Sequence, residues 1–241
     1  MTLVATPIGN LGDLSPRAME ALQSADFWLV EDTRVSGKLQ AAFGWHVPMR
    51  VLNEHTSERQ MLQYVSDLQG LRGALITDAG APGISDPGAA LVDLCHERGV
   101  PVVGVPGPSA IIAALMVSGF FAQRFAFLGF LPRQAGALRA ALSPFTESPL
   151  TLVVFESSFR LDRLILGAAD VLPCRRYAVC RELTKKHEQV WRGRLPEPPD
   201  LAAVPRRGEF TVVFEGARRT GTRGEDGRLG NAAKMPPCTD A

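Results

Sequence analysis

The sequence has few cysteines, and none of the four forms a CxxC pair or a Cys/His cluster with metal-ligand spacing. This pattern argues against a zinc site and against a disulfide framework, and we expect no bound metal. No apolar run approaches the length that spans a bilayer, and residues 1–4 enter an apolar stretch without a basic leader or a cleavage pattern. We therefore expect a cytoplasmic protein without a membrane partner.

The chain also lacks an excess of charge of one sign, since its formal net charge is +1 over 241 residues. The charges are nevertheless unevenly distributed. Residues 1–99 hold 7 basic and 12 acidic side chains, whereas residues 160–194 hold 9 basic and 4 acidic ones. The basic segment predicts a face that contacts phosphate groups, although a solvated edge with salt bridges would explain the charges equally well.

Short apolar runs alternate with amphipathic stretches through the first half of the chain, which is typical of a parallel sheet with crossover helices. This pattern predicts an N-terminal α/β domain over 1–118, with Val100–Val105 as a strand buried on both faces. A second α/β domain is predicted over 119–216, where strands without long helices between them indicate a mixed sheet. The polar residues 217–241 contain almost no large apolar side chains and are predicted to form a disordered tail.

One stretch, over residues 75–95, is the best candidate for a ligand site. It reads as a strand end, a loop dense in Gly and Pro, and an amphipathic helix that Ser85 or Asp86 could cap. A tight strand-to-helix connection usually needs 2–6 residues, and this loop is roughly twice as long. Such loops lie at the carboxyl edge of a parallel sheet, where ligands bind, and Asp78 would leave the strand there as a hydrogen-bond acceptor.

Eight strings follow one another between about residue 3 and residue 216: VATPIGNLGDLSPRA, EDTR, ITDAGAPGISDPG, VPGPSA, FLGFLPR, FESSFR, RELTKKHEQVWRG and RGEFTVVFEG. Together they resemble the tetrapyrrole methylase superfamily, and within it the branch of bacterial small-subunit ribosomal RNA cytidine 2′-O-methyltransferases. The resemblance implies two α/β domains with S-adenosylmethionine in the cleft between them, and a homodimer. The cofactor contacts that it implies are Asp78, Ala79, Gly80, Pro82, Ile84, Ser109, Ala110, Ser157, Glu182 and Thr211.

The sequence departs from the superfamily pattern in three places. Members that act on porphyrin precursors open with a GxGxGD loop, whereas residues 5–13 here read ATPIGNLGD, as in the RNA branch. The ESPHR motif is replaced by Glu156-Ser157-Ser158-Phe159-Arg160, so its histidine is absent. The C-terminal helical segment of many RNA-branch members has no counterpart in residues 217–241.

The resemblance implies 2′-O-methylation of a cytidine near the decoding site of small-subunit ribosomal RNA, either bare or in the assembled subunit. An alcohol is a weak nucleophile, so a general base would assist. The candidates are Asp32 held by Arg34, the Glu54/His55 pair, and Lys185. Expected RNA contacts are Lys38, Arg160, Arg163, Arg181, Lys186 and Arg192. Two alternatives stay open: a tetrapyrrole C-methyltransferase, and a non-catalytic RNA-binding assembly module.

Overall fold

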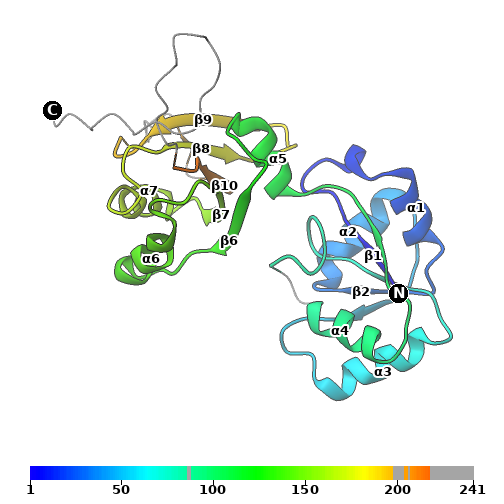
Figure 1. Ribbon diagram of the computed structural model, residues 1–241. Helices are drawn as coiled ribbons and strands as arrows, with labels where there is room; N and C mark the ends of the chain where they lie inside the picture. The colour runs from blue at the N-terminus through cyan, green and yellow to red at the C-terminus, as the bar shows by residue number, and fades with distance from the viewer. Residues whose placement is uncertain (86–87, 198–203, 206, 218–241) are drawn as a thin grey trace, which may run out of the picture. The chain divides into compact units, whose positions relative to one another are not determined.

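The computed structural model describes residues 1–85, 88–197, 204–205 and 207–217 (Figure 1). It consists of two compact units, Met1–Ala110 and Ile111–Ala241, and each is described by itself. The predicted tail lies outside the described residues except for Ala217, whose N–H donates to the Ser148 carbonyl.

The first unit contains a five-stranded parallel sheet in the order β3-β2-β4-β1-β5. Its strands are β1 (Thr2–Val4), β2 (Phe27–Val30), β3 (Met49–Val51), β4 (Gly73–Leu75) and β5 (Val103–Val105). Its helices are the 3-10 turn η1 (Leu11–Asp13) and α1 (Pro16–Gln23), α2 (Thr33–Phe43), α3 (Glu58–Leu68) and α4 (Ala89–Glu97). The alternation of strands and helices that the sequence predicts is therefore confirmed.

Alternate side chains of each central strand face opposite layers of this sheet, because successive side chains point to opposite faces of a strand. Trp28 and Val30 pack with side chains of α1 and α2, whereas Phe27 and Leu29 pack with side chains of α3 and α4. Both faces are covered, as expected for a parallel sheet.

Two local predictions in the first unit are wrong. Strand β5 is an edge strand that pairs only with β1 among the described strands, so Val103 is 54% exposed and not buried on both faces. Helix α4 begins after Gly88, which forms no side-chain cap, so Ser85 does not cap it; Asp86 lies outside the described residues.

The second unit contains a mixed sheet in the order β6-β7-β10-β8-β9, in which only β6 and β7 are parallel. Its strands are β6 (Phe125–Phe130), β7 (Thr151–Ser157), β8 (Arg176–Arg181), β9 (Gln189–Arg194) and β10 (Glu209–Phe214). Its helices are α5 (Ala110–Ser118), α6 (Ala135–Leu142), the 3-10 turn η2 (Ser143–Phe145) and α7 (Leu161–Ala169). The predicted mixed sheet is confirmed.

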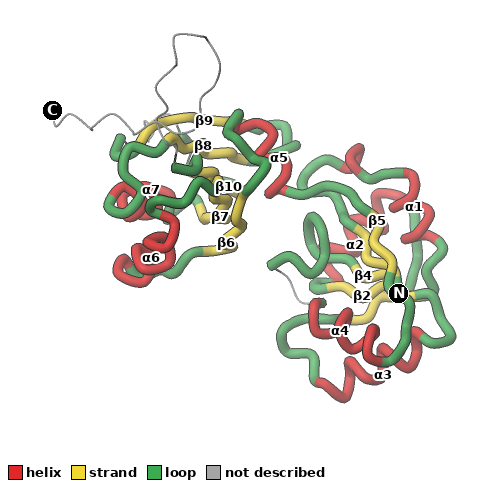
Figure 2. Tube along the Cα trace, in the orientation of Figure 1, coloured by secondary structure: helices red, strands yellow, loops and turns green. Residues whose placement is uncertain are grey.

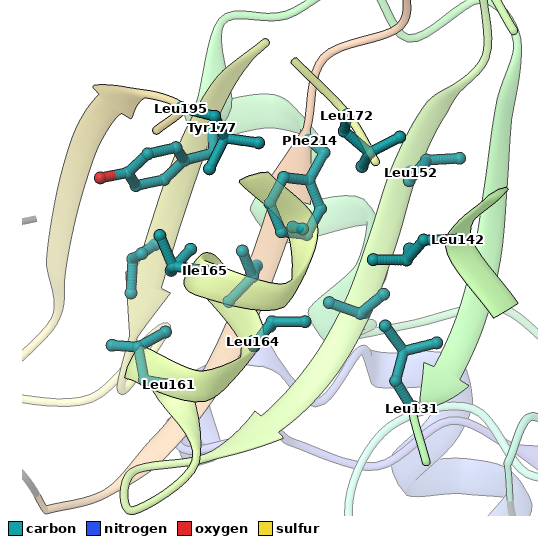
Figure 3. Close-up of a cluster of buried hydrophobic side chains, with 14 of the residues drawn as sticks. Leu131, Leu142, Leu152, Leu161, Leu164, Ile165, Leu172, Tyr177, Leu195 and Phe214 are labelled. Carbon is teal, nitrogen blue, oxygen red and sulfur yellow. The ribbon is translucent and has the colours of Figure 1, made fainter. Parts of the chain in front are cut away.

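The core of this unit lies between one face of the sheet and helices α6 and α7. Figure 3 shows Leu161, Leu164 and Ile165 of α7 pointing toward Tyr177 and Phe214 of the sheet. Helix α5 lies on the opposite face, where the Cys180 thiol is 4.0 Å from the Ala114 carbonyl oxygen. This packing places α5 in the second unit, although the sequence predicts the domain boundary after it, at residue 118.

Two of the cysteines, Cys95 and Cys180, are buried free thiols, whereas Cys174 is disulfide-bonded. Within the described ranges no group of three or more His, Cys, Asp or Glu side chains could hold a metal ion. No helix in that part of the chain is long and apolar enough to cross a membrane.

Candidate active site

The first unit has a topological switch point between β1 and β4. These strands are parallel neighbours, yet the helices that follow them, α1 and α4, lie on opposite faces of the sheet. The connections therefore diverge beyond the carboxyl ends of the two strands and open a crevice, which is where open α/β sheets bind ligands. Thr6 and Pro7 leave β1 at this point, and Thr77 and Asp78 leave β4.

The loop after β4 is tied to the exit of β1 by paired backbone hydrogen bonds. The Thr6 N–H donates to the Gly80 carbonyl at 2.9 Å, and the Gly80 N–H donates to the Thr6 carbonyl at 3.0 Å. Gly80 has φ +88°, a conformation that favours glycine. Below this bridge the Thr6 hydroxyl donates to the Thr77 carbonyl at 3.2 Å. The loop therefore has a fixed base, from which it projects beyond the sheet (Figure 2).

The predicted cofactor residues of this unit lie along this loop and the β5 exit. Pro82 is buried, whereas Ala79 and Ile84 are exposed, and Ser109 and Ala110 are half-buried at the start of α5. A Cβ at Gly80 would lie 3.8 Å from the Pro108 carbonyl oxygen, so the two segments are neighbours. At Gly83, with φ +82°, a Cβ would meet no heavy atom of the described residues within 4 Å apart from its chain neighbours, which fits a backbone that a ligand can approach. These features fit a group that binds against bare backbone, as S-adenosylmethionine would here.

A cavity of about 1060 Å³ lies at the carboxyl ends of β2, β3 and β4. The structure brings Asp32 and Arg34, the Glu54/His55 pair and Asp78 together around it, as expected from side chains that follow parallel strands. The remaining lining residues are Glu31, Leu52, Asn53, Thr56, Met61, Ser85 and Gly88–Leu91.

The Asp32 carboxylate is committed to Arg34. It caps α2 by accepting from the Arg34 N–H at 2.8 Å, and it accepts from the guanidinium at 2.5–3.1 Å. These hydrogen bonds, first from the side chain and then from the backbone, lower the pKa of Asp32 to about 2. A carboxylate with so low a pKa is a weak proton acceptor, which disfavours Asp32 among the predicted candidates for the base.

The pKa of Asp78 is shifted in the opposite direction from that of Asp32. Partial burial raises its pKa above the ordinary value; the nearby Asp32 carboxylate adds to this rise, while a hydrogen bond from the Asp32 backbone and the Arg34 charge oppose it. A raised pKa makes a carboxylate a better general base. Asp78 is also shared between two cavities, because it lines a second, smaller one described below.

In the second unit, Glu182 and Lys185 belong to one ion-pair cluster with Glu209. The Lys185 ammonium lies 3.0 Å from Glu182 and 2.9 Å from Glu209, and the Glu182 carboxylate also accepts from the Glu209 N–H. Burial lowers the pKa of Lys185, but its hydrogen bonds to Glu209 and Glu182 outweigh burial and raise the pKa overall. Lys185 is therefore a stable cation, which disfavours the hypothesis that it acts as a base.

The other residues predicted to contact the cofactor from this unit occupy different environments. Ser157 is exposed at the end of β7, and its N–H donates to the Glu156 carboxylate at 2.7 Å. Thr211 lies in β10, between β7 and β8, and is 5% exposed. Its side chain therefore either packs in the core of this unit or lines the wall of a binding site.

Two arginines predicted to bind RNA are held inside the second unit. Arg181 is 8% exposed and donates to the carbonyls of Arg207 and His187. Arg160 pairs with buried Glu156 at 3.2 Å and donates to the Leu131 carbonyl. Each guanidinium thus has internal partners, which favours a structural role for Arg160 and Arg181 over the predicted RNA contact.

Most of the basic excess over 160–194 is structural in the same way. Arg175 is buried and donates to backbone carbonyls, and Arg176 pairs with Glu215. Arg163, Lys186 and Arg192 remain exposed, and the Arg192 guanidinium lies 4.9 Å from the centroid of the Phe120 ring. Lys38 is exposed on α2 of the first unit.

Thr6 and Thr77, which tie the exits of β1 and β4 together, and the buried Ser36 of α2 are not among the residues that the sequence predicts for the site. Thr6 and Thr77 stand directly after β1 and β4, so the signal was present in the strand ends. Ser36 reads as an ordinary helical residue, and only the packing around it shows that its position matters.

Comparison with known proteins places this architecture in a class. The family model of Tetrapyrrole (Corrin/Porphyrin) Methylases matches residues 1–199, and the chain belongs to this family. The fold agrees: a diphthine synthase crystal structure superposes with a TM-score of 0.66 at 17% identity, covering 89% of this chain and 90% of that one. A uroporphyrin-III C-methyl transferase from Thermus thermophilus, complexed with S-adenyl homocysteine, gives a TM-score of 0.60 at 20% identity, covering 88% and 95%.

Within the family, two similar sequences carry the same name. Proteins named "Ribosomal RNA small subunit methyltransferase I" are 41% identical over 218 residues in Synechocystis sp. and 42% identical over 223 residues in Mycobacterium tuberculosis. The alignments cover 89% and 90% of this chain and 78% of each relative.

Proposed function

We propose that this chain is an S-adenosylmethionine-dependent methyltransferase that acts on the RNA of the small ribosomal subunit. The observation that carries the proposal is the identity of about 41% to named ribosomal RNA small subunit methyltransferases over 89% of the chain. The finer assignment, to the 2′-hydroxyl of a cytidine near the decoding site, follows the resemblance of the motifs. A ribosomal RNA substrate implies a cytoplasmic enzyme.

In this proposal the loop over 78–84 and the segment Ser109-Ala110 hold the cofactor, and Ser157, Glu182 and Thr211 are the further contacts that the motif resemblance implies. When bound, S-adenosylmethionine supplies the methyl group. The fixed base of the loop at Thr6 and Gly80 holds the backbone in one place, which favours catalysis by positioning.

Asp78 then acts as the general base. Its carboxylate accepts the proton of the ribose 2′-hydroxyl as that oxygen bonds to the methyl carbon and the carbon–sulfur bond breaks. Its raised pKa and its place at the switch point support this role, whereas the low pKa of Asp32 and the raised pKa of Lys185 disfavour theirs. The Asp32–Arg34 pair instead holds the N-terminus of α2 beside Asp78.

The test is transfer of labelled methyl from S-adenosylmethionine to naked small-subunit RNA and to assembled small subunits. Ribose methylation mapped in a strain lacking this chain, and again after complementation, identifies the nucleotide. Methyl incorporation into a porphyrin precursor would instead support the tetrapyrrole alternative, which the absence of a GxGxGD loop disfavours. RNA binding without incorporation into either RNA substrate would support the non-catalytic assembly module.

We further propose a homodimer that uses the outer face of α5. This helix is apolar on all sides, and although Ile111 and Leu115 are buried, Ile112 and Met116 are exposed, the latter by 76%. Exposed apolar residues grouped on one helix are typical of an interaction surface. Met116→Asp should convert a dimer into a monomer in analytical ultracentrifugation, whereas Leu166→Asp, at an exposed apolar position on α7, should not. A monomeric wild-type protein would contradict the proposal.

A further inference from the structure

A second cavity, of about 240 Å³, lies beside Asp78 on the α1 and α2 side of the first sheet. The exit of β1, the first half of α2 and the end of β4 enclose it. Its lining residues are Thr6, Pro7, Leu11, Val35, Ser36, Lys38, Leu39, Ile76, Thr77 and Asp78. We refer to it as the α2 cavity.

One buried polar group in the lining of the α2 cavity has no partner in the described part of the chain. Ser36 is 3% exposed, and its hydroxyl makes no hydrogen bond in the described part of the chain. The two other hydroxyls of the lining are occupied, because Thr6 donates to the Thr77 carbonyl and Thr77 donates to the Ala79 carbonyl. A buried hydroxyl without a partner destabilises a fold, so its presence in a cavity wall indicates a ligand that completes it.

The rest of the lining defines the chemistry of that ligand. Pro7, Val35 and Leu39 provide apolar walls that suit a flat ring, while the Ser36 hydroxyl can both donate and accept a hydrogen bond. Lys38 is exposed at the cavity and forms no ion pair with any residue that the structure describes. A planar heterocycle with a polar edge and an adjoining phosphate matches this arrangement, and S-adenosylmethionine has no phosphate.

We propose that the α2 cavity receives a nucleobase of single-stranded RNA, with the Ser36 hydroxyl bonded to its polar edge and Lys38 paired with the neighbouring phosphate. This inference rests on the proposed function and adds the residues that read the nucleotide. Bases of single-stranded RNA can be splayed out and recognised on their edges, as such a pocket requires. Because Asp78 lines the same cavity, a base seated there would bring its ribose next to the proposed general base. Ser36 is thus a specificity residue that does not take part in the chemistry.

The test is Ser36→Ala in the full chain. RNA affinity, measured by fluorescence anisotropy with a short single-stranded RNA, and the KM for RNA in methyl transfer should each weaken about tenfold, the loss expected for one buried hydrogen bond. The affinity for S-adenosylhomocysteine by calorimetry should not change. The melting temperature should stay level or rise, because the change removes an unpaired buried hydroxyl.

The matched control is Ser118→Ala. Ser118 is also buried in a helix, but its hydroxyl donates to the Leu115 carbonyl and accepts from the Phe120 N–H. This variant should lower the melting temperature and leave RNA affinity unchanged. If Ser36→Ala leaves RNA affinity unchanged, or weakens S-adenosylhomocysteine binding instead, the inference is wrong. The anisotropy measurement does not depend on methyl transfer. A wild-type protein that binds RNA through Ser36 but does not methylate it would therefore contradict the proposed function and leave this inference standing.

Discussion

At the scale of single residues, two neighbouring carboxylates receive opposite environments. Asp32 accepts four hydrogen bonds from Arg34 and has a pKa of about 2, whereas the pKa of Asp78 is raised by partial burial and by the Asp32 charge. When two neighbouring carboxyl groups have pKa values that their environments shift in opposite directions, the two groups can serve different roles in a reaction. Here Asp32 stabilises the N-terminus of α2, and Asp78 is the residue that we propose for proton transfer.

Replacing Asp78 by Asn should lower kcat about 10²- to 10⁴-fold, because a positioned general base contributes a factor of this size. The acidic limb of the kcat–pH profile, which in the wild type should lie above the ordinary carboxyl pKa, should disappear. Because Asp78 also belongs to the loop proposed to hold the cofactor, binding of S-adenosylhomocysteine should be measured in parallel by calorimetry, and kcat at saturating S-adenosylmethionine should carry the larger loss.

Asp32→Asn is the control for Asp78→Asn. An amide oxygen can still accept from the Arg34 N–H and cap α2, so the unfolding free energy should change little. The acidic limb of the pH profile should persist. If Asp32→Asn removed that limb and Asp78→Asn did not, the two roles would have to be exchanged.

At the scale of elements, the turn after β8 depends on the cluster of Lys185 with Glu182 and Glu209. Glu182 adopts φ +52°, and a Cβ at Gly208 would approach its side chain to 2.7 Å, so the turn fits only with glycine opposite it. The ion pairs fix Glu182, a predicted cofactor contact, in this conformation.

Lys185→Met should lower the unfolding free energy by about 1 kcal/mol at neutral pH, since the pair is only partly buried. The folded protein lowers the pKa of Glu182. The contribution of Glu182 to the unfolding free energy is therefore fully present above the ordinary carboxyl pKa, and it is lost as the pH falls through the lowered pKa of the folded state. The pKa of Lys185 is raised, so its share is lost only as the pH rises through that raised value.

Urea unfolding at several pH values checks this pattern. The difference between wild type and Lys185→Met should be constant near neutrality and shrink at acid pH. Lys186→Met, at the exposed neighbouring position, should cause little change at any pH. Equal losses for the two variants would show that the cluster does not support the turn.

The elements also show what could be predicted from the sequence. Apolar runs identified most of the strands and helices, and the structure adds local detail such as the Ser15 cap of α1, which accepts from the Ala18 N–H. Strand order is not encoded locally, so the Val run at β5 could not be recognised as an edge strand. Charge counts likewise could not separate Arg181, which is buried against carbonyls, from Lys186, which is exposed, because only tertiary packing decides which cation finds an internal partner.

At the scale of the whole molecule, the two units contribute different things to the proposed reaction. The first unit contains the switch point, Asp78 and the two cavities that Asp78 lines. The second unit has a few exposed basic side chains, while most of its other basic side chains bind carboxylates or backbone carbonyls within the unit. RNA binding by this protein should therefore depend on a small number of phosphate contacts.

Salt titrations measure that number, because for single-stranded RNA the plot of log K against log salt has a negative slope whose magnitude falls by about 0.7 for each phosphate contact that is lost. Lys186→Ala and Lys38→Ala should each reduce the slope by about this amount. Arg139→Ala should leave it unchanged, since Arg139 on α6 pairs with Asp170. An unaltered slope in Lys186→Ala would remove the turn after β8 from the RNA-binding face, and an unaltered slope in Lys38→Ala would leave the α2 cavity without its phosphate contact.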